Sequence, residues 1–149
     1  MEWLFKAAGL CLVFSASASA GFLKAYKLTV RVKRLDFFYR GISDIRERIR
    51  VGTGETERLL NICFGNAVTF GGSVGINAAG LEKEDAEIIT EFFENIGMSN
   101  SEAEYERAGV YMELVRNQRE KAEKRRAELS RLYRSLGISV GAFLCIFFL

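Results

Sequence analysis

The chain contains no proline in its 149 residues, whereas an average usage of about 5% would supply roughly seven. Proline lacks a backbone N–H and its ring clashes with the preceding helical turn, so it interrupts helices. Without it, a helix can run for many turns before anything stops it. The sequence therefore predicts long helices joined by few tight turns.

Hydrophobic residues recur at steps of three and four over three stretches, 28–51, 81–96 and 105–136. This spacing places them on one face of a helix. We therefore predict an all-α fold, an antiparallel helical bundle whose two long arms continue into N- and C-terminal membrane anchors. The glycine-rich stretch 65–80 lacks the periodicity, and we interpret it as a loop or as loosely packed helices.

Glycines and capping residues mark the expected helix boundaries. Thr53 is a candidate N-cap for a short helix that begins near Leu59. Gly97 is expected to end one helix, and Ser99 with Glu102 has the spacing of a capping box that opens the next.

Both ends of the chain are apolar and uncharged. Neither residues 7–23 nor residues 135–149 include an Asp, Glu, Lys or Arg. A spanning helix needs about 20 apolar residues, so both runs are near the short limit. We predict an N-terminal transmembrane anchor over residues 1–23, a cytosolic helical domain over 24–134, and a C-terminal hydrophobic anchor over 135–149.

Basic residues adjoin the inner side of both apolar ends. The membrane-flanking set comprises Lys24, Lys27, Arg31, Arg131 and Arg134. Such residues favour the cytosolic side of a membrane and are attracted to anionic headgroups. We therefore expect the protein in the cell membrane, with its charged middle in the cytosol and both termini facing outward.

The N-terminal run allows a second interpretation. The small-residue triplets at 16–18 and 18–20 resemble signal-peptidase sites. Cleavage there would leave a secreted or periplasm-facing helical interaction module. The basic residues that follow the run resist export and favour an uncleaved anchor.

Charge divides the middle of the chain into three blocks. Residues 24–50 hold nine basic and three acidic residues, 55–106 hold two and 11, and 107–134 hold nine and four. We expect the acidic block to face a partner protein. The candidate partner-binding residues are Glu84, Glu87, Glu91 and Glu94. Every carboxylate of the helix over 81–96, Asp85 included, is expected to face water.

The composition argues against catalysis. The chain has no histidine, so it lacks the commonest general base and the commonest zinc ligand. Its three cysteines are far apart in the sequence, and no phosphate-binding glycine loop or nucleic-acid motif is present. We therefore expect a protein that is not an enzyme, with no catalytic residues, cofactor, metal, nucleic-acid partner or small-molecule substrate.

Gly137 and Gly141 form a G-x-x-x-G step within the C-terminal apolar run. Small residues at this spacing let two membrane helices approach closely. We predict a helix-packing role for this pair, with the small-residue run 15–21 as the candidate contact.

Three segments carry a family resemblance. They are residues 45–53 (IRERIRVGT), residues 92–99 (FFENIGMS), and residues 133–137 (YRSLG) with Gly141. In these segments the chain resembles stage III sporulation protein AB of endospore-forming bacteria. It departs from the family pattern at Gly54, where proline is usual, and at Asn100, where aspartate is usual.

The resemblance implies a function as well as a fold. It implies a non-catalytic integral membrane subunit of the channel between mother cell and forespore, in the mother-cell membrane that faces the forespore. The family is similar to helical domains of secretion and pilus platform proteins, which implies that the cytosolic head docks a secretion-type ATPase. Its other implied partners are the remaining proteins of the channel.

Overall fold

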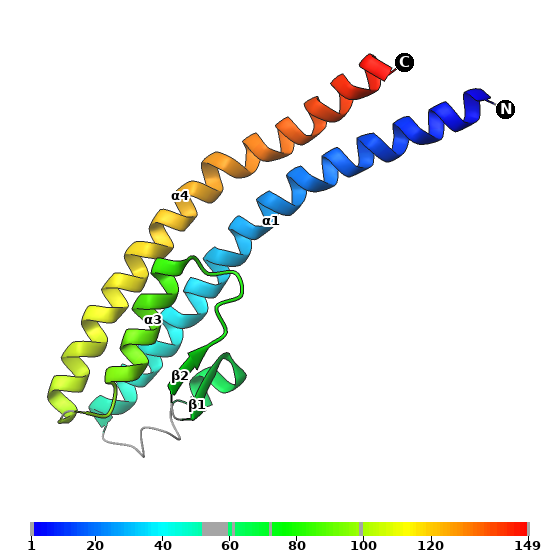
Figure 1. Cartoon of the computed structure of the whole chain (residues 1–149). Coiled ribbons are helices and arrows are strands. Elements are labelled where there is room, and N and C mark those ends of the chain that lie inside the picture. Colours follow the sequence, from blue (N-terminus) through cyan, green and yellow to red (C-terminus); the bar gives the residue numbers. More distant parts are fainter. Residues whose placement is uncertain (1, 52–59, 61, 72, 99, 149) are drawn as a thin grey trace. The chain divides into compact units, whose positions relative to one another are not determined.

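The computed structural model describes residues 2–51, 60, 62–71, 73–98 and 100–148. Two long helices dominate it, α1 (Glu2–Val51) and α4 (Ser101–Phe148) (Figure 1). Each is roughly four times as long as an average helix. The prediction of a mostly helical chain is confirmed.

The chain divides into two compact units. We call Met1–Val30 with Ala122–Leu149 the terminal unit, and Arg31–Lys121 the central unit. Each long helix contributes one segment to each unit. The anchor boundaries predicted from the sequence lie inside the two segments of the terminal unit, and they stay a prediction.

The central unit is a small helical bundle. Within it, α3 (Lys83–Asn95) lies beside α1 and α4 (Figure 1). The segments of α1 and α4 run antiparallel, since Arg119 bonds to Asp36 while Arg46 bonds to Tyr105. The buried core comprises Leu35, Phe38, Ile42 and Ile45 of α1, Ile89, Phe92 and Phe93 of α3, and Ala108, Tyr111 and Val115 of α4. The periodic faces predicted for these helices are the faces that pack.

Aromatic rings join the helices of this core. Phe64 stacks on Phe38 with ring centroids 5.7 Å apart, and it meets Phe93 edge-on at 4.8 Å. Phe92 contacts both Phe93 and Tyr111 in edge-on geometry. These are the favourable arrangements of aromatic pairs. Phe64, from the helical residues 62–64, thus fills the space between α1 and α3.

The glycine-rich stretch 65–80 departs from the prediction. It forms a 3-10 turn, η1 (Gly65–Ala67), and a hairpin of β1 (Val68–Gly71) and β2 (Ser73–Ile76). The strands are antiparallel, with Val68 opposite Ile76, and the N–H of Asn77 donates to the carbonyl of Ala67. The prediction of a loop or of loosely packed helices was therefore wrong for the two strands, while residues 77–80 form an irregular segment and a turn. Here β-branched residues between glycines favour strands, and Val68 is buried in the core.

The helix ends show how the connections are made. Gly97 adopts a φ of 87° after α3, as expected of a glycine that ends a helix. The side-chain oxygen of Asn100 accepts a hydrogen bond from the N–H of Ala103 and so caps α4. The candidate N-caps Thr53 and Ser99 and the start near Leu59 lie outside the described residues.

In the terminal unit the segments of α1 and α4 run antiparallel, because Phe14 lies against Gly141 while Gly21 lies against Gly137. Among the described residues, no helix holds a stretch both long and apolar enough to cross a membrane.

One glycine within α1 is required by packing. Gly41 is buried, and a Cβ atom at this position would overlap the Phe64 ring. Glycine inside a helix costs about 1 kcal/mol relative to alanine. At this position that cost is offset, because the missing side chain lets an aromatic ring seat directly on the helix backbone.

We expect Gly41→Ala to destabilise the protein by about 1–3 kcal/mol, because overpacking outweighs the gain in helix propensity. Urea unfolding of the full chain, followed by circular dichroism, measures this. In a Phe64→Ala background the same substitution should cost little or stabilise. An equal loss in both backgrounds would contradict the packing explanation.

Candidate functional site

A buried ion pair joins α1 to the start of α3. The Nε of Arg31 lies 2.7 Å from Asp85 Oδ2, and its Nη2 lies 2.9 Å from Oδ1, so the contact is bidentate. Arg31 Nη1 also meets Glu82 Oε1 at 2.6 Å. Only 6% of Arg31 and 1% of Asp85 is exposed. Paired and fully hydrogen-bonded charges are the ones that tolerate burial.

Asp85 also caps the start of α3. Its Oδ2 accepts the N–H of Glu82 at 3.1 Å, while the Glu82 side chain accepts the N–H of Asp85. This capping box begins α3. The hydrogen bonds of Asp85 raise the pKa of Arg31 against the lowering effect of burial, and the charges of Asp85, Glu82 and Glu84 add to the increase. The guanidinium thus stays charged.

One sequence expectation is corrected by this pair. Asp85 was expected to face water, and it is buried. Arg31, which was predicted among the membrane-flanking residues, is buried in the central unit, and its membrane-flanking role stays a prediction. One signal could have found the pair: Asp85 lies four residues before Ile89 and therefore on the apolar face of α3.

The four glutamates named as partner-binding residues share one exposed face. Glu84, Glu87, Glu91 and Glu94 follow at steps of three and four along α3, and each is exposed. We call this set the acidic stripe. Lys83 Nζ approaches Glu87 at 3.5 Å, a contact between two largely exposed side chains. The stripe is thus a negative surface on the side of α3 that is turned away from the core.

One glutamate of the acidic stripe, Glu91, contacts the core residue Tyr111. Burial raises the pKa of Tyr111, and the charge of Glu91 together with its hydrogen bond to the phenol raises it further. The phenol therefore stays protonated at neutral pH, next to a glutamate of the stripe. Tyr111 also packs edge-on against Phe92.

A further contact in the central unit was missed by sequence reasoning. The guanidinium carbon of Arg46 lies 4.1 Å from the centroid of the Tyr105 ring, and its Nε donates to the Tyr105 carbonyl at 3.2 Å. Gly109 leaves room for this guanidinium, since a Cβ there would lie 3.2 Å from it. Cation–π stacking and a hydrogen bond thus join α1 to α4 here.

The glycines of the G-x-x-x-G step lie where the two helices of the terminal unit meet. A Cβ on Gly137 would be 3.3 Å from the Cα of Gly21 and 3.2 Å from the carbonyl oxygen of Ser17. The hydroxyl of Ser17 donates to the carbonyl of Gly137 at 3.0 Å. Gly141 faces the ring of Phe14. The backbones therefore approach closely at these residues, while their role in a membrane stays a prediction.

The remaining membrane-flanking residues are exposed in the terminal unit. Lys24 lies 5.3 Å above the Tyr133 ring, and Arg134 lies 5.9 Å above the Phe22 ring. Both contacts run between α1 and α4. Lys27 and Arg131 are also exposed.

Comparison with known proteins identifies the family of this chain. The model of the stage III sporulation protein AB family matches residues 73–149. The chain belongs to this family. The match covers β2, α3 and α4, and it includes the acidic stripe as well as the motifs at residues 92–99 and 133–141.

Membership of the stage III sporulation protein AB family indicates a role in sporulation. The motif at residues 45–53 lies before the matched region. No curated protein and no solved structure matches the chain.

We expect Asp85→Asn to cost about 3–5 kcal/mol of unfolding free energy, because it leaves the Arg31 charge buried without a full partner. The matched control is Glu87→Gln on the exposed face, which should change stability by less than about 1 kcal/mol. Replacing both partners, as in Arg31→Met with Asp85→Leu, should cost less than Asp85→Asn alone. Urea unfolding measures all three, and equal effects for Asp85→Asn and Glu87→Gln would contradict a structural pair.

Proposed function

We propose that the protein is a non-catalytic membrane subunit of the sporulation channel between mother cell and forespore, with a cytosolic head that docks a secretion-type ATPase. The observation that carries the proposal is the family match over residues 73–149. The surfaces of the two units support it in different ways.

The terminal unit supports membrane attachment. Large apolar side chains of its two helices are exposed, among them Leu12, Leu23, Phe143, Ile146 and Phe147. Large exposed apolar patches mark sites of contact with a membrane or with another protein. Lipid would cover them, and the uncharged runs 7–23 and 135–149 would then insert as a packed pair. The close approach of Gly21 to Gly137 suits such a pair.

The basic residues support a direction of insertion. Lys24, Lys27, Arg131 and Arg134 are exposed beside the uncharged runs and toward the middle of the chain. Residues of this type favour the cytosolic side. We therefore propose that the protein resides in the mother-cell membrane facing the forespore, with the central unit in the cytosol and both termini outside.

The central unit supports partner docking. The acidic stripe is exposed along α3, and the buried pair of Arg31 and Asp85 fixes the start of that helix. A row of like charges on a rigid helix steers and orients a basic partner surface. The proposed partner is the cytosolic ATPase of the channel, together with other channel proteins.

A reporter map tests the orientation. We expect a reporter fused near residue 80 to be cytosolic and one fused at the C-terminus to be external, while the chain stays in the membrane fraction after alkaline washing. The alternative is a secreted or periplasm-facing module with a cleaved signal. A mature N-terminus at Gly21, with the chain in the exported fraction, would overturn the topology and favour that alternative.

Charge reversal tests the docking. We expect the triple variant Glu87→Lys, Glu91→Lys and Glu94→Lys to reduce co-purification of the channel ATPase from membranes of sporulating cells by at least about tenfold, because opposed charges become like charges. Circular dichroism should show an unchanged fold.

The matched control reverses three exposed carboxylates of α4, namely Glu102, Glu106 and Glu113. It makes the same change in net charge and should leave co-purification near the wild-type level. If the ATPase is retained equally by both triple variants, the acidic stripe is only a solvated surface.

A further inference from the structure

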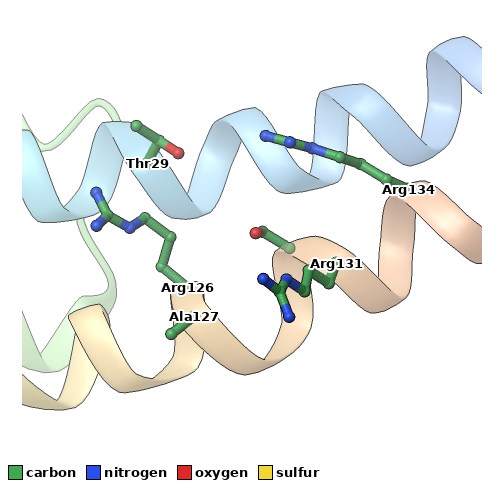
Figure 2. A pocket seen from close by; sticks show the side chains of 6 residues that line it. Thr29, Arg126, Ala127, Arg131 and Arg134 are labelled. Atoms are coloured by element: carbon green, nitrogen blue, oxygen red, sulfur yellow. The ribbon is translucent and has the colours of Figure 1, made fainter.

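A cavity lies between the two helices of the terminal unit. Its volume is about 620 Å³, and it is lined by Thr29 of α1 and by Arg126, Ala127, Ser130, Arg131 and Arg134 of α4. Figure 2 shows Arg126 and Arg134 extending from α4 toward α1. Half of the lining residues are arginines, and none carries a carboxylate. We call this cavity the arginine pocket.

The arginines of the pocket differ from several arginines of the central unit. Arg31, Arg116 and Arg119 each hold a carboxylate within ion-pair distance. Over the part of the chain that the structure describes, no carboxylate lies within that distance of Arg126, Arg131 or Arg134. Three like charges thus line one cavity with no ion-pair partner among the described residues. Their repulsion would be relieved by an anion.

The chemistry of the lining selects the kind of anion. A guanidinium binds phosphate oxygens through two parallel N–H donors, which makes arginine the preferred partner of phosphate groups. The hydroxyl of Thr29 already donates to the carbonyl of Ala25 at 3.3 Å, so the charged donors for an anion are the arginines, beside the hydroxyl of Ser130. A phosphate group is small compared with the cavity, which leaves room for the groups attached to it.

The position of the pocket in the chain indicates where the phosphate comes from. Arg134 is the last charged residue before the uncharged run 135–149. Its guanidinium carbon lies 5.9 Å above the Phe22 ring, and Phe22 belongs to the other uncharged run. Exposed apolar side chains, Leu132 and Leu136, adjoin it on α4. Charged donors next to apolar surface match the boundary between lipid headgroups and acyl chains.

We propose that the arginine pocket binds the phosphate of an anionic membrane lipid, with Arg126, Arg131 and Arg134 as its donors. The proposal rests on the membrane attachment proposed above. It adds that the attachment is selective for the headgroup, through a site built between α1 and α4 rather than through a diffuse positive surface.

The test uses the full chain, purified in an uncharged detergent. Short-chain phosphatidylglycerol, short-chain phosphatidylcholine and inorganic phosphate are titrated separately, and bound ligand is read by native mass spectrometry. We expect phosphatidylglycerol to bind more tightly than either of the others. The triple variant Arg126→Gln, Arg131→Gln and Arg134→Gln should lose at least about tenfold in affinity for it.

The control removes three exposed positive charges that do not line the pocket, as Lys33→Gln, Lys121→Gln and Lys124→Gln. It should keep the wild-type affinity. Equal losses of affinity in both triple variants, or equal binding of the two lipids, would contradict the proposal that the arginine pocket binds an anionic lipid. Inorganic phosphate binding as tightly as phosphatidylglycerol would overturn the lipid as its ligand.

A second measurement separates this proposal from membrane attachment itself. The wild-type chain is mixed with vesicles of phosphatidylcholine alone and with vesicles that also contain phosphatidylglycerol, and the vesicles are floated. We expect incorporation into both, with a preference for the anionic vesicles that only the arginine variant loses. Absence of the chain from both kinds of vesicle would contradict the proposed membrane attachment. Incorporation into both without preference would contradict only the proposed lipid binding by the arginine pocket.

Discussion

The pair of Arg31 and Asp85 is the interaction on which the central unit depends. A bidentate guanidinium fixes both the separation and the rotation of α3 relative to α1, which apolar contacts alone leave adjustable. The same carboxylate caps α3, so the helix begins where the ion pair holds it. Ile89, Phe92 and Phe93 then meet the core, and the glutamates on the opposite side meet solvent. One buried ion pair therefore sets the orientation of α3, so that its apolar face meets the core and its acidic face meets solvent.

The long helices could be predicted from the sequence because their pattern is local. Apolar residues at steps of three and four, and the absence of proline, are sufficient to indicate α1, α3 and α4. The faces that pack in the central unit could be predicted in the same way. The exposure of Glu84, Glu87, Glu91 and Glu94 also follows from that pattern.

The errors arose where distant residues decide the outcome. Asp85 was assigned to the surface because a carboxylate is ordinarily there, and its partner Arg31 is 54 positions away in the chain. The hairpin over residues 68–76 was obscured by its glycines, although Val68, Val74 and Ile76 are typical strand residues. The arginine pocket requires two helices to be placed side by side, and no spacing along one helix predicts it.

The contact between Ser17 and Gly137 has a mechanical consequence. Sliding one helix past the other by a turn is a shift of about 5.4 Å. Such a shift would break the hydroxyl-to-carbonyl bond and would move Gly21 away from Gly137. Axial slip between these two segments is therefore opposed by this contact. A force along the axis of one segment is therefore transmitted to the other segment through this contact.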